Sequence, residues 1–213
     1  MKINLNRIYP LSFVPSNERI SDVWSTDLIF SSNEKYLIIA PSGTGKSSLT
    51  GFLYGFRNDY SGDVFFDEKN IANLKLDEWT LIRQKKISVI FQDLRLFEQL
   101  SVEENIHLKC SLGTLLTKEN ISEFANRMGI ADLFPRNVGT LSMGQKQRVA
   151  ILRALIQPFE FLLMDEPFSH LDPENISKAL ELINDVCANH KAGFIITSLD
   201  QTYNFKYTKI LHL

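Results

Sequence analysis

The stretch that decides the fold is APSGTGKSSL, which spans Ala40–Leu49. It follows the apolar run YLIIA (36–40) and leads into SSLTGFLYGF (47–56), whose apolar residues fall at helical spacing. An apolar run without alternation is typical of a strand that is buried on both faces of a parallel sheet. A buried strand, a loop that contains glycine and a helix form the context in which a phosphate-binding loop occurs.

The chemistry of such a loop explains the residue types that it contains. Successive backbone N–H groups surround the anion, and the helix N-terminus adds partial positive charge. Lys46 is expected to reach the β- and γ-phosphates, and the Ser47 hydroxyl is expected to coordinate Mg²⁺. The nucleotide-binding candidates in the loop are Ser42, Gly43, Thr44, Gly45, Lys46, Ser47 and Ser48. Taken alone, the stretch also fits a strand-to-helix turn with a solvated lysine.

The first position of the motif departs from the usual pattern. Ala40 stands where glycine is expected. Alanine is tolerated at a strand end unless the residue there needs a positive φ. We therefore expect Ala40 to leave the phosphate site intact.

Composition excludes several classes of protein. The chain has 213 residues, of which 44% are hydrophobic and 23% charged, as in a globular domain rather than a disordered chain. No apolar run approaches the ~20 residues of a membrane helix, and the first residues lack the apolar core of a signal peptide. The net charge of −2 gives no support for nucleic-acid binding. Cys110 and Cys187 are expected to be free thiols.

Hydrophobic patterning predicts the order of the elements. Alternation in the first 35 residues predicts antiparallel strands, and GDVFFDEKNI (62–71) is predicted to be an edge strand. No strand is predicted between residues 93 and 139, where two helices are expected, the first capped by Ser101 and Glu104. This portion is therefore interpreted as a helical insertion. Alternating strands and helices are predicted at 77–86 (helix), 87–92 (strand), 161–165 (strand), 174–190 (helix), 193–197 (strand) and 209–213 (strand).

A second chemical motif is FLLMDEP (161–167), an apolar strand that ends in two acids. This pattern places carboxylates at the carboxyl edge of a parallel sheet, where ligands of α/β folds bind. Asp165 is expected to hold Mg²⁺ through its water shell, and Glu166 to polarise a water for attack on the γ-phosphorus. The alternative is a pair of carboxylates in a surface loop.

The third motif is LSMGQKQRVAILRAL (141–155), in which Ser142 and Gln145 form a predicted capping box before an apolar-periodic helix. This segment resembles the signature of the ATP-binding cassette (ABC) family, although Met143 stands where the family has glycine. Gln92 in VIFQD resembles the Q-loop glutamine of that family, and SHLD (169–172) resembles its D-loop. The order of all the motifs is that of the family.

The resemblance implies a single domain over residues 1–213. Its expected fold is an α/β P-loop NTPase (RecA-like) with a parallel sheet core, an antiparallel β subdomain and an inserted helical subdomain at about 93–148. It also implies an ATPase that packs head to tail, with itself or with a paralogous ATPase. Each ATP then lies between the phosphate loop of one protomer and the signature turn of the other. On that basis the partner-facing nucleotide contacts are Ser142, Gly144, Gln145 and Asp172, and the Mg²⁺ ligands are Ser47, Gln92 and Asp165.

Two further site positions follow from the resemblance. The family stacks adenine on an aromatic upstream of the phosphate loop, and Phe13 is the candidate, with Tyr9 as the rival. The family also carries a switch histidine after a late strand, but FIITSLD (194–200) has Ser198 at that place. Ser198 joins Glu166 and Gln92 as a catalytic candidate. A serine cannot present a ring nitrogen to the γ-phosphate, so we expect slow or partner-dependent turnover with intact ATP binding.

The resemblance also implies a separate integral membrane subunit, because the chain has no predicted membrane span or substrate domain. Leu94, Leu96 and Phe97 are the candidate docking residues, and local core is the alternative for them. The expected place is the cytoplasm, on the inner face of the cell membrane. No regulatory domain is expected after KILHL. In this compactness the chain resembles the small ATPases of the lipoprotein-release, macrolide-efflux and cell-division type. The contrasting hypothesis is a soluble cassette ATPase or a slow ATP-dependent conformational switch.

Overall fold

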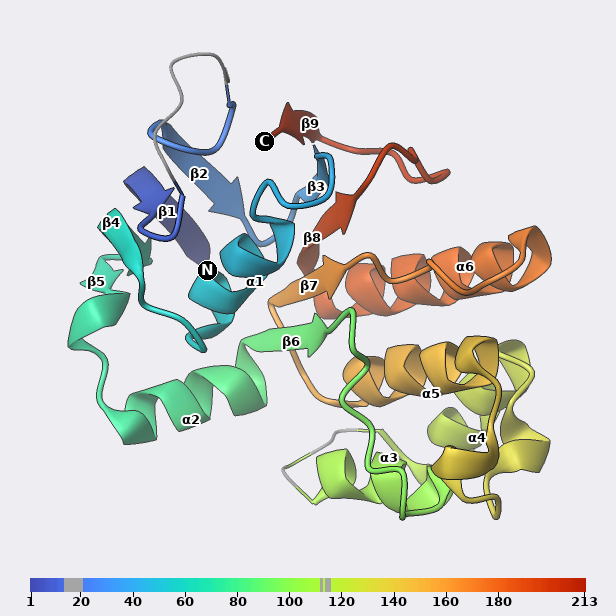
Figure 1. The fold of residues 1–213 in the computed structure, drawn as a ribbon. Helices are drawn as coiled ribbons and strands as arrows, with labels where there is room; N and C mark the ends of the chain where they lie inside the picture. Colours follow the sequence, from blue (N-terminus) through green and yellow to red (C-terminus); the bar gives the residue numbers. More distant parts are fainter. Residues whose placement is uncertain (14–20, 112, 114–115) are drawn as a thin grey trace.

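The computed structural model describes residues 1–13, 21–111, 113 and 116–213. Its centre is a parallel sheet with the strand order β6-β7-β8-β3-β9 (Figure 1). The strands are β3 (Lys35–Ile39), β6 (Ile87–Ile90), β7 (Phe161–Asp165), β8 (Gly193–Ser198) and β9 (Lys209–His212). Every residue of β7 and β8 is buried, as expected of strands that are covered on both faces.

The register of the parallel sheet brings three motif ends together. Ile39, the last residue of β3, is paired with Ser198 on β8, and Asp165 on β7 is paired with Thr197. The phosphate loop, the acidic pair and the predicted switch position therefore emerge from neighbouring strands at the same edge of the sheet. This edge is where open α/β sheets bind their ligands.

A second sheet is antiparallel, with the order β2-β1-β4-β5. Its strands are β1 (Lys2–Pro10), β2 (Asp27–Ser31), β4 (Tyr60–Phe66) and β5 (Lys69–Asn70). The prediction of one edge strand over 62–71 is wrong, because β4 lies between β1 and β5. The short turn at Asp67, which has φ 53°, reverses the chain so that the two-residue β5 forms the edge.

The helices fall where the sequence places them. They are α1 (Lys46–Tyr54), α2 (Leu76–Lys85), α3 (Val102–Cys110), α4 (Lys118–Arg127), α5 (Met143–Ile156) and α6 (Pro173–His190). Short 3₁₀ helices span Ile71–Asn73, Ala131–Leu133 and Val138–Thr140. Within the described part of 93–139 there is no strand, only an isolated bridge between Ser101 and Asn137. The predicted capping boxes at Ser101 and Ser142 are both confirmed.

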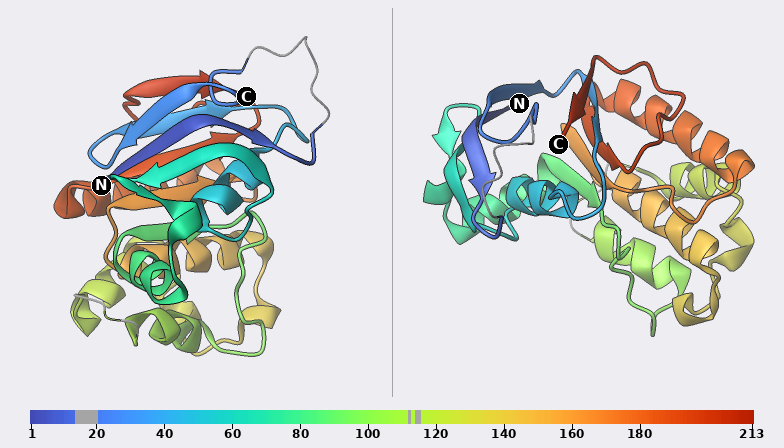
Figure 2. Two further views of the ribbon diagram at one scale, coloured as in Figure 1. Left: turned by 90° about the vertical axis from the view of Figure 1, so that its left-hand side faces the viewer. Right: turned by 45° about the horizontal axis from the view of Figure 1, so that its top comes forward.

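Two hydrophobic cores lie on opposite faces of the parallel sheet. One contains α1, with Leu49 and Phe52, between the parallel sheet and the antiparallel sheet. The other joins the parallel sheet to the helices α3, α4, α5 and α6. Figures 1 and 2 show the result, with the antiparallel sheet and α2 on one side and the helical portion on the other. The carboxyl edge of the parallel sheet thus lies between two separately packed parts of the molecule.

Candidate functional site: a phosphate loop beside an acidic strand end

The phosphate-loop candidate connects β3 to α1 through residues 40–45. Gly43 and Gly45 have φ values of 78° and 102°, which lie in the left-handed region that favours glycine. Ala40 has no positive φ, which explains why alanine fits at this position. Its N–H donates to the Ser198 carbonyl at 3.0 Å, so the start of the loop is tied to the end of β8.

Lys46 begins α1 and is almost completely buried at 5% exposed. Its Nζ donates to the carbonyls of Ala40 and Pro41 at 2.9 and 3.0 Å. The same atom lies 3.2 Å from Oε1 of Glu166, which comes from the end of β7. The loop therefore wraps around its own lysine, and the lysine points toward the acidic pair.

Neighbouring hydroxyls and one indole fix the loop from the outside. The Thr44 hydroxyl donates to the Pro41 carbonyl at 2.8 Å, and Nε1 of Trp24 donates to the Thr44 carbonyl at 3.1 Å. The Ser48 hydroxyl is buried and accepts from Arg57 at 2.8 Å. Ser47, in contrast, is exposed in the first turn of α1, where a magnesium ligand must be accessible.

Phe13 lies directly beside the loop. A Cβ added to Gly45 would fall 3.0 Å from the Phe13 ring and 2.9 Å from the Trp24 ring. Glycine is therefore required at residue 45 both for its φ and for the close approach of two aromatic rings. Tyr9, the rival for adenine stacking, packs edge-to-face on Phe13 at 6.5 Å between ring centroids. Phe13, and not Tyr9, is among the residues that line the pocket over the loop.

Hydrogen bonds to β8 orient both acidic residues at the end of β7. Asp165 is buried, and its Oδ1 accepts from the Thr197 hydroxyl at 2.6 Å. Glu166 has φ 47°, an uncommon value for a residue with a side chain, and its N–H donates to the Thr197 carbonyl at 3.2 Å. The Glu166 side chain is 14% exposed and faces Lys46. Sequence reasoning missed Thr197, whose pairing depends on the β7–β8 register.

Gln92 completes the pocket from the end of β6. It lines the phosphate-loop pocket together with Glu166, Lys46 and Ser47. It also lines an adjoining cavity of about 430 Å³, to which Ser47 and Asp165 contribute. The three predicted magnesium ligands, Ser47, Gln92 and Asp165, therefore border one cavity. Their oxygen atoms are of the kind that Mg²⁺ prefers.

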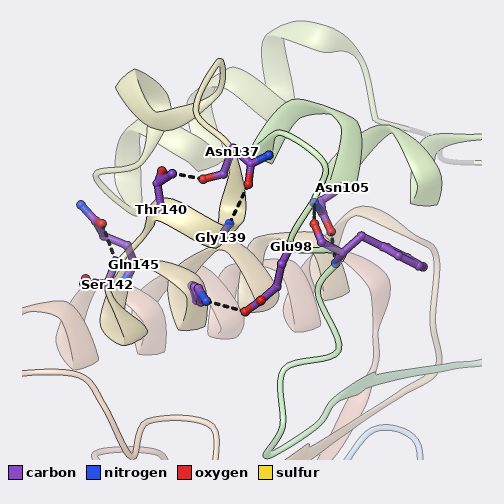
Figure 3. A network of polar contacts seen from close by, with 9 residues as sticks. Glu98, Asn105, Asn137, Gly139, Thr140, Ser142 and Gln145 are labelled. Carbon is purple, nitrogen blue, oxygen red and sulfur yellow. Dashed lines mark hydrogen bonds and ion pairs between the residues drawn. The ribbon is translucent and has the colours of Figure 1, made fainter.

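The signature candidates lie on a different surface. Ser142 caps α5: its Oγ accepts from the Gln145 N–H at 3.3 Å, and its own N–H donates to Oε1 of Gln145 at 3.0 Å (Figure 3). A Cβ added to Gly144 would lie 2.9 Å from the His170 carbonyl oxygen. Ser142, Gly144 and Gln145 do not line the phosphate-loop pocket of their own chain. This separation is the arrangement that a head-to-tail dimer requires.

Asp172 and Ser198 also stand outside that pocket. Asp172 caps α6, where its Oδ1 accepts from the Asn175 N–H at 2.8 Å, and this bond holds the pKa of the carboxyl below its usual value. Ser198 is 2% exposed, and its Oγ accepts from the Gln201 N–H at 3.1 Å. Burial raises the pKa of Tyr203 and a side-chain hydrogen bond with Ser198 opposes that rise, so the Ser198 hydroxyl already has a second partner.

Comparison with known proteins decides the family. A family model described as "ABC transporter" matches residues 25–169. The chain is 36% identical over 194 residues to the thiamine import ATP-binding protein ThiQ of Aliivibrio fischeri, and this match covers 90% of the chain and 79% of the relative. It is 37% identical to ThiQ of Salmonella typhimurium over 78% of the chain and 69% of the relative. The chain belongs to the ABC transporter family.

Solved structures agree with this result. The dimeric post-hydrolysis state of the ATP-binding cassette MJ0796, bound to ADP and Pi, superposes with a TM-score of 0.75 at 26% identity, covering 94% of this chain and 88% of that one. A bacterial Atm1-family ABC exporter with ATP bound has a TM-score of 0.79 at 23% identity, covering 100% of this chain and 36% of the exporter chain, and supports the fold alone.

Membership of the ABC family establishes the general activity. The chain is an ATPase subunit that uses ATP and Mg²⁺, forms a dimer and works with a membrane partner. No helix in the described residues is long and apolar enough to cross a bilayer. The relatives named above are import subunits, so the likeness to lipoprotein-release and macrolide-efflux ATPases stays a prediction without support from them.

The candidate docking residues of this ABC subunit differ in exposure. Leu94 is buried at 4% exposed and Leu96 packs against the core, so neither presents an anchor on the surface. The Phe97 ring is 55% exposed, and Asn105 holds its main chain through both the N–H, at 2.9 Å, and the carbonyl, at 3.0 Å. Only Phe97 of the three has the geometry of an exposed anchor.

Proposed function

We propose that this ABC subunit binds ATP in the pocket over the phosphate loop and hydrolyses it with Glu166. Phe13 stacks on adenine, and Lys46 contacts the terminal phosphates. Ser47, Gln92 and Asp165 are the candidate Mg²⁺ ligands. The observation that carries the proposal is the 3.2 Å contact between Nζ of Lys46 and Oε1 of Glu166, because it joins the phosphate-binding lysine to the catalytic carboxylate in one pocket.

The other half of each ATP site is proposed to come from the dimer partner. The capped N-terminus of α5 presents the Ser142 hydroxyl, free N–H groups and a positive dipole end, all suited to a γ-phosphate. Gly144, Gln145 and Asp172 belong to the same surface. Charge-assisted hydrogen bonds contribute about 1.5–3 kcal/mol each. A few such bonds, made with ATP and lost with ADP, are enough to change the population of a dimer almost completely.

Equilibrium binding of Mg·ATP to the purified chain tests the nucleotide site. The wild-type chain is expected to bind, whereas Lys46→Ala is expected to weaken binding at least tenfold by loss of the phosphate contact. A matched control is Lys178→Ala, which removes an exposed ion pair with Glu174 on α6. Equal affinity of all three proteins would refute the assignment of the phosphate loop.

Ser198 is proposed to act at the switch position as a weak substitute for histidine. In this role the Ser198 hydroxyl turns from Tyr203, with which it forms a hydrogen bond, and forms a single hydrogen bond with the nucleotide or with its attacking water. Loss of one hydrogen bond of about 0.5–1.5 kcal/mol corresponds to a change of about two- to tenfold in rate. We expect slow phosphate release by the wild-type chain and a further decrease of that size in Ser198→Ala. Fast turnover that Ser198→Ala leaves unchanged would remove Ser198 from the mechanism.

The membrane partner is proposed to dock beside Phe97. The neighbouring surface carries the half-exposed ring of Phe56, and the Arg95 guanidinium lies over the Phe56 and Phe91 rings at 4.2 and 4.0 Å. Exposed aromatic rings with a planar cation are typical anchors of protein interfaces. The cavity beneath them reaches Ser47 and Asp165, so a docked segment would lie next to the nucleotide site. The chain would then work in the cytoplasm, on the inner face of the membrane.

Photo-crosslinking from residue 97 in cells, followed by co-purification, identifies the partner. A crosslink to an integral membrane protein supports the proposal. The names of the relatives make a small-molecule importer the first assembly to examine. Recovery of the chain entirely outside the membrane fraction, without a crosslink, would favour the soluble cassette ATPase instead.

A further inference from the structure

Gln147 bridges the signature helix and the acidic strand end within one chain. It lies on α5 and is 1% exposed. Its Oε1 accepts from the His170 N–H at 2.9 Å, and its Nε2 donates to the Glu166 carbonyl at 3.4 Å. One buried amide therefore spans the turn that runs from Glu166 to His170, and both ends of the amide are used.

The turn from Glu166 to His170 determines where the Glu166 carboxylate points. Glu166 has φ 47°, a left-handed backbone conformation that is unfavourable for a residue with a side chain. Such a conformation persists only where the surroundings hold it. The Glu166 N–H is held by the Thr197 carbonyl, whereas among the described residues its carbonyl oxygen has only long contacts of 3.4 Å, to Ser169 and to Gln147. Gln147 is thus one of few restraints on the residue that directs the catalytic carboxylate.

The same helix begins at the signature turn. Ser142 caps α5, and Gln147 follows between one and two turns later. The helix touches the acidic turn at a second point, because a Cβ at Gly144 would lie 2.9 Å from the His170 carbonyl oxygen. A displacement of the α5 N-terminus therefore acts on the Glu166–His170 turn through both the Gln147 amide and the Gly144 backbone.

We propose that Gln147 is a positioning residue that couples the two ATP sites of the dimer. The inference rests on the proposed function, in which Ser142 contacts the ATP held by the partner and Glu166 acts on the ATP held by its own chain. ATP at one site fixes α5 of the opposite chain, and Gln147 transmits that position to Glu166 of the same opposite chain. Hydrolysis at each site then depends on occupation of the other.

The experiment compares variants of the full chain under conditions in which it dimerises with ATP. Gln147→Leu removes both hydrogen bonds at similar volume. Gln147→Glu keeps the acceptor for the His170 N–H and removes the donor to the Glu166 carbonyl. The control is Ser88→Ala, which deletes a buried bond of 2.6 Å from Ser88 to the Ala154 carbonyl on the same helix. Phosphate release against ATP concentration gives kcat, KM and the Hill coefficient, and thermal unfolding gives Tm.

Both Gln147 variants are expected to lose at least tenfold in kcat, with a Hill coefficient that falls toward 1 and a Mg·ATP affinity within twofold of wild type. Ser88→Ala is expected to lower Tm while it retains kcat and cooperativity. A purely structural role predicts that Gln147→Leu behaves like Ser88→Ala, and that result overturns the inference, as does a wild-type Hill coefficient of 1. Failure of the wild-type chain to bind ATP refutes the proposed function itself, so the two failures are distinguishable.

Discussion

Glu166 forms a buried ion pair with Lys46 and is also the proposed general base. Their charged atoms are 3.2 Å apart, and their side chains are 6% and 14% exposed. Nζ of Lys46 also donates to two carbonyls, so those bonds hold the ammonium group in place when the proposed phosphate contact replaces the one to Glu166. In the proposed mechanism Glu166 is then available to polarise a water, and its backbone, with φ 47°, orients the carboxylate. A substitution that keeps the shape of Glu166 but removes its charge separates binding from hydrolysis.

Glu166→Gln is expected to lower kcat by about a hundredfold or more, because general-base catalysis contributes about 10²–10⁴-fold. ATP binding is expected to remain, and the ATP-bound dimer should accumulate because it no longer converts its nucleotide to ADP. Phosphate release measures the first effect, and size-exclusion chromatography with Mg·ATP measures the second. Glu160→Gln is the matched control just before the same strand, where Glu160 contacts the N-terminus and Lys86. Normal turnover by Glu166→Gln would exclude Glu166 as the base.

The N-terminal turn of α5 combines helix capping with a proposed phosphate contact. Ser142→Ala removes the cap and is expected to cost about 1 kcal/mol of unfolding free energy, and also to weaken ATP-dependent dimerisation. Ser142→Asp keeps a good cap but directs a carboxylate at the γ-phosphate. It should therefore retain stability and lose the ATP-dependent dimer. Chemical denaturation and chromatography in the Glu166→Gln background measure the two effects.

The control for this element is Thr117→Asp, at the cap of α4, where the Thr117 hydroxyl accepts from the Asn120 N–H at 3.3 Å. That substitution also exchanges one capping residue for another, but on a helix outside the proposed interface. It should leave dimerisation unchanged. If Ser142→Asp dimerises as well as Thr117→Asp, the signature turn does not face a phosphate.

The C-terminal end of α6 carries a group whose charge opposes folding. Burial lowers the pKa of His190, whose Nδ1 has no hydrogen-bond partner among the residues that the structure describes and whose ring packs edge-to-face on Phe159 at 5.0 Å. Because the folded-state pKa lies below the unfolded value of about 6.5, the unfolded chain takes up a proton first as the pH falls. Stability from neutral His190 is therefore present above pH ~6.5 and is lost below it, with a slope of at most about 1.4 kcal/mol per pH unit.

Urea denaturation of wild type and His190→Gln at pH 7.5 and pH 5.5 tests this prediction. The wild-type chain should lose more unfolding free energy between these pH values than the variant, because glutamine does not titrate. The difference between the two proteins removes the contribution of the other histidines, which both contain. Equal losses would mean that His190 is protonated in the folded chain as readily as in the unfolded one.

At the scale of the whole molecule, sequence predicts whatever is encoded locally. Local sequence determines the turns at glycines, the helix caps at Ser101 and Ser142 and the apolar runs of the strands. The predicted elements and their order are accordingly confirmed. The burial of Leu94 and the interior position of β4 depend on packing between distant segments. For Leu94 the sequence left docking and local core as alternatives, and for β4 it predicted an edge strand. The Thr197–Asp165 bond and the Gln147 bridge were missed for the same reason. The roles of individual site residues came from resemblance to the ABC family, which the comparisons confirm at the level of the family.

In the proposed assembly, the loop that joins the two separately packed cores connects the membrane partner to the nucleotide. The loop from Gln92 to Leu100 leaves the parallel sheet, presents Phe97 and joins the helical portion. There, the Glu98 side chain pairs with Lys146 of α5 at 2.6 Å (Figure 3). The Glu98 carbonyl also accepts from the Gly139 N–H at 2.9 Å. A displacement of Phe97 by a docked partner would therefore move the segment directly before Ser142. This arrangement links the proposed docking site to the proposed γ-phosphate contact without passing through the phosphate loop.

Phe97→Asp tests this link, because a charged residue at an apolar anchor disfavours docking. The variant is expected to leave the membrane fraction, whereas the Mg·ATP affinity of the purified chain stays within twofold of wild type, since Phe97 does not line the phosphate-loop pocket. Ile29→Asp is the matched control, because Ile29 is 57% exposed on β2 in the antiparallel sheet. Quantitative blotting of membrane and soluble fractions measures the outcome. If Phe97→Asp stays with the membrane as fully as Ile29→Asp does, the partner docks on another face of the chain.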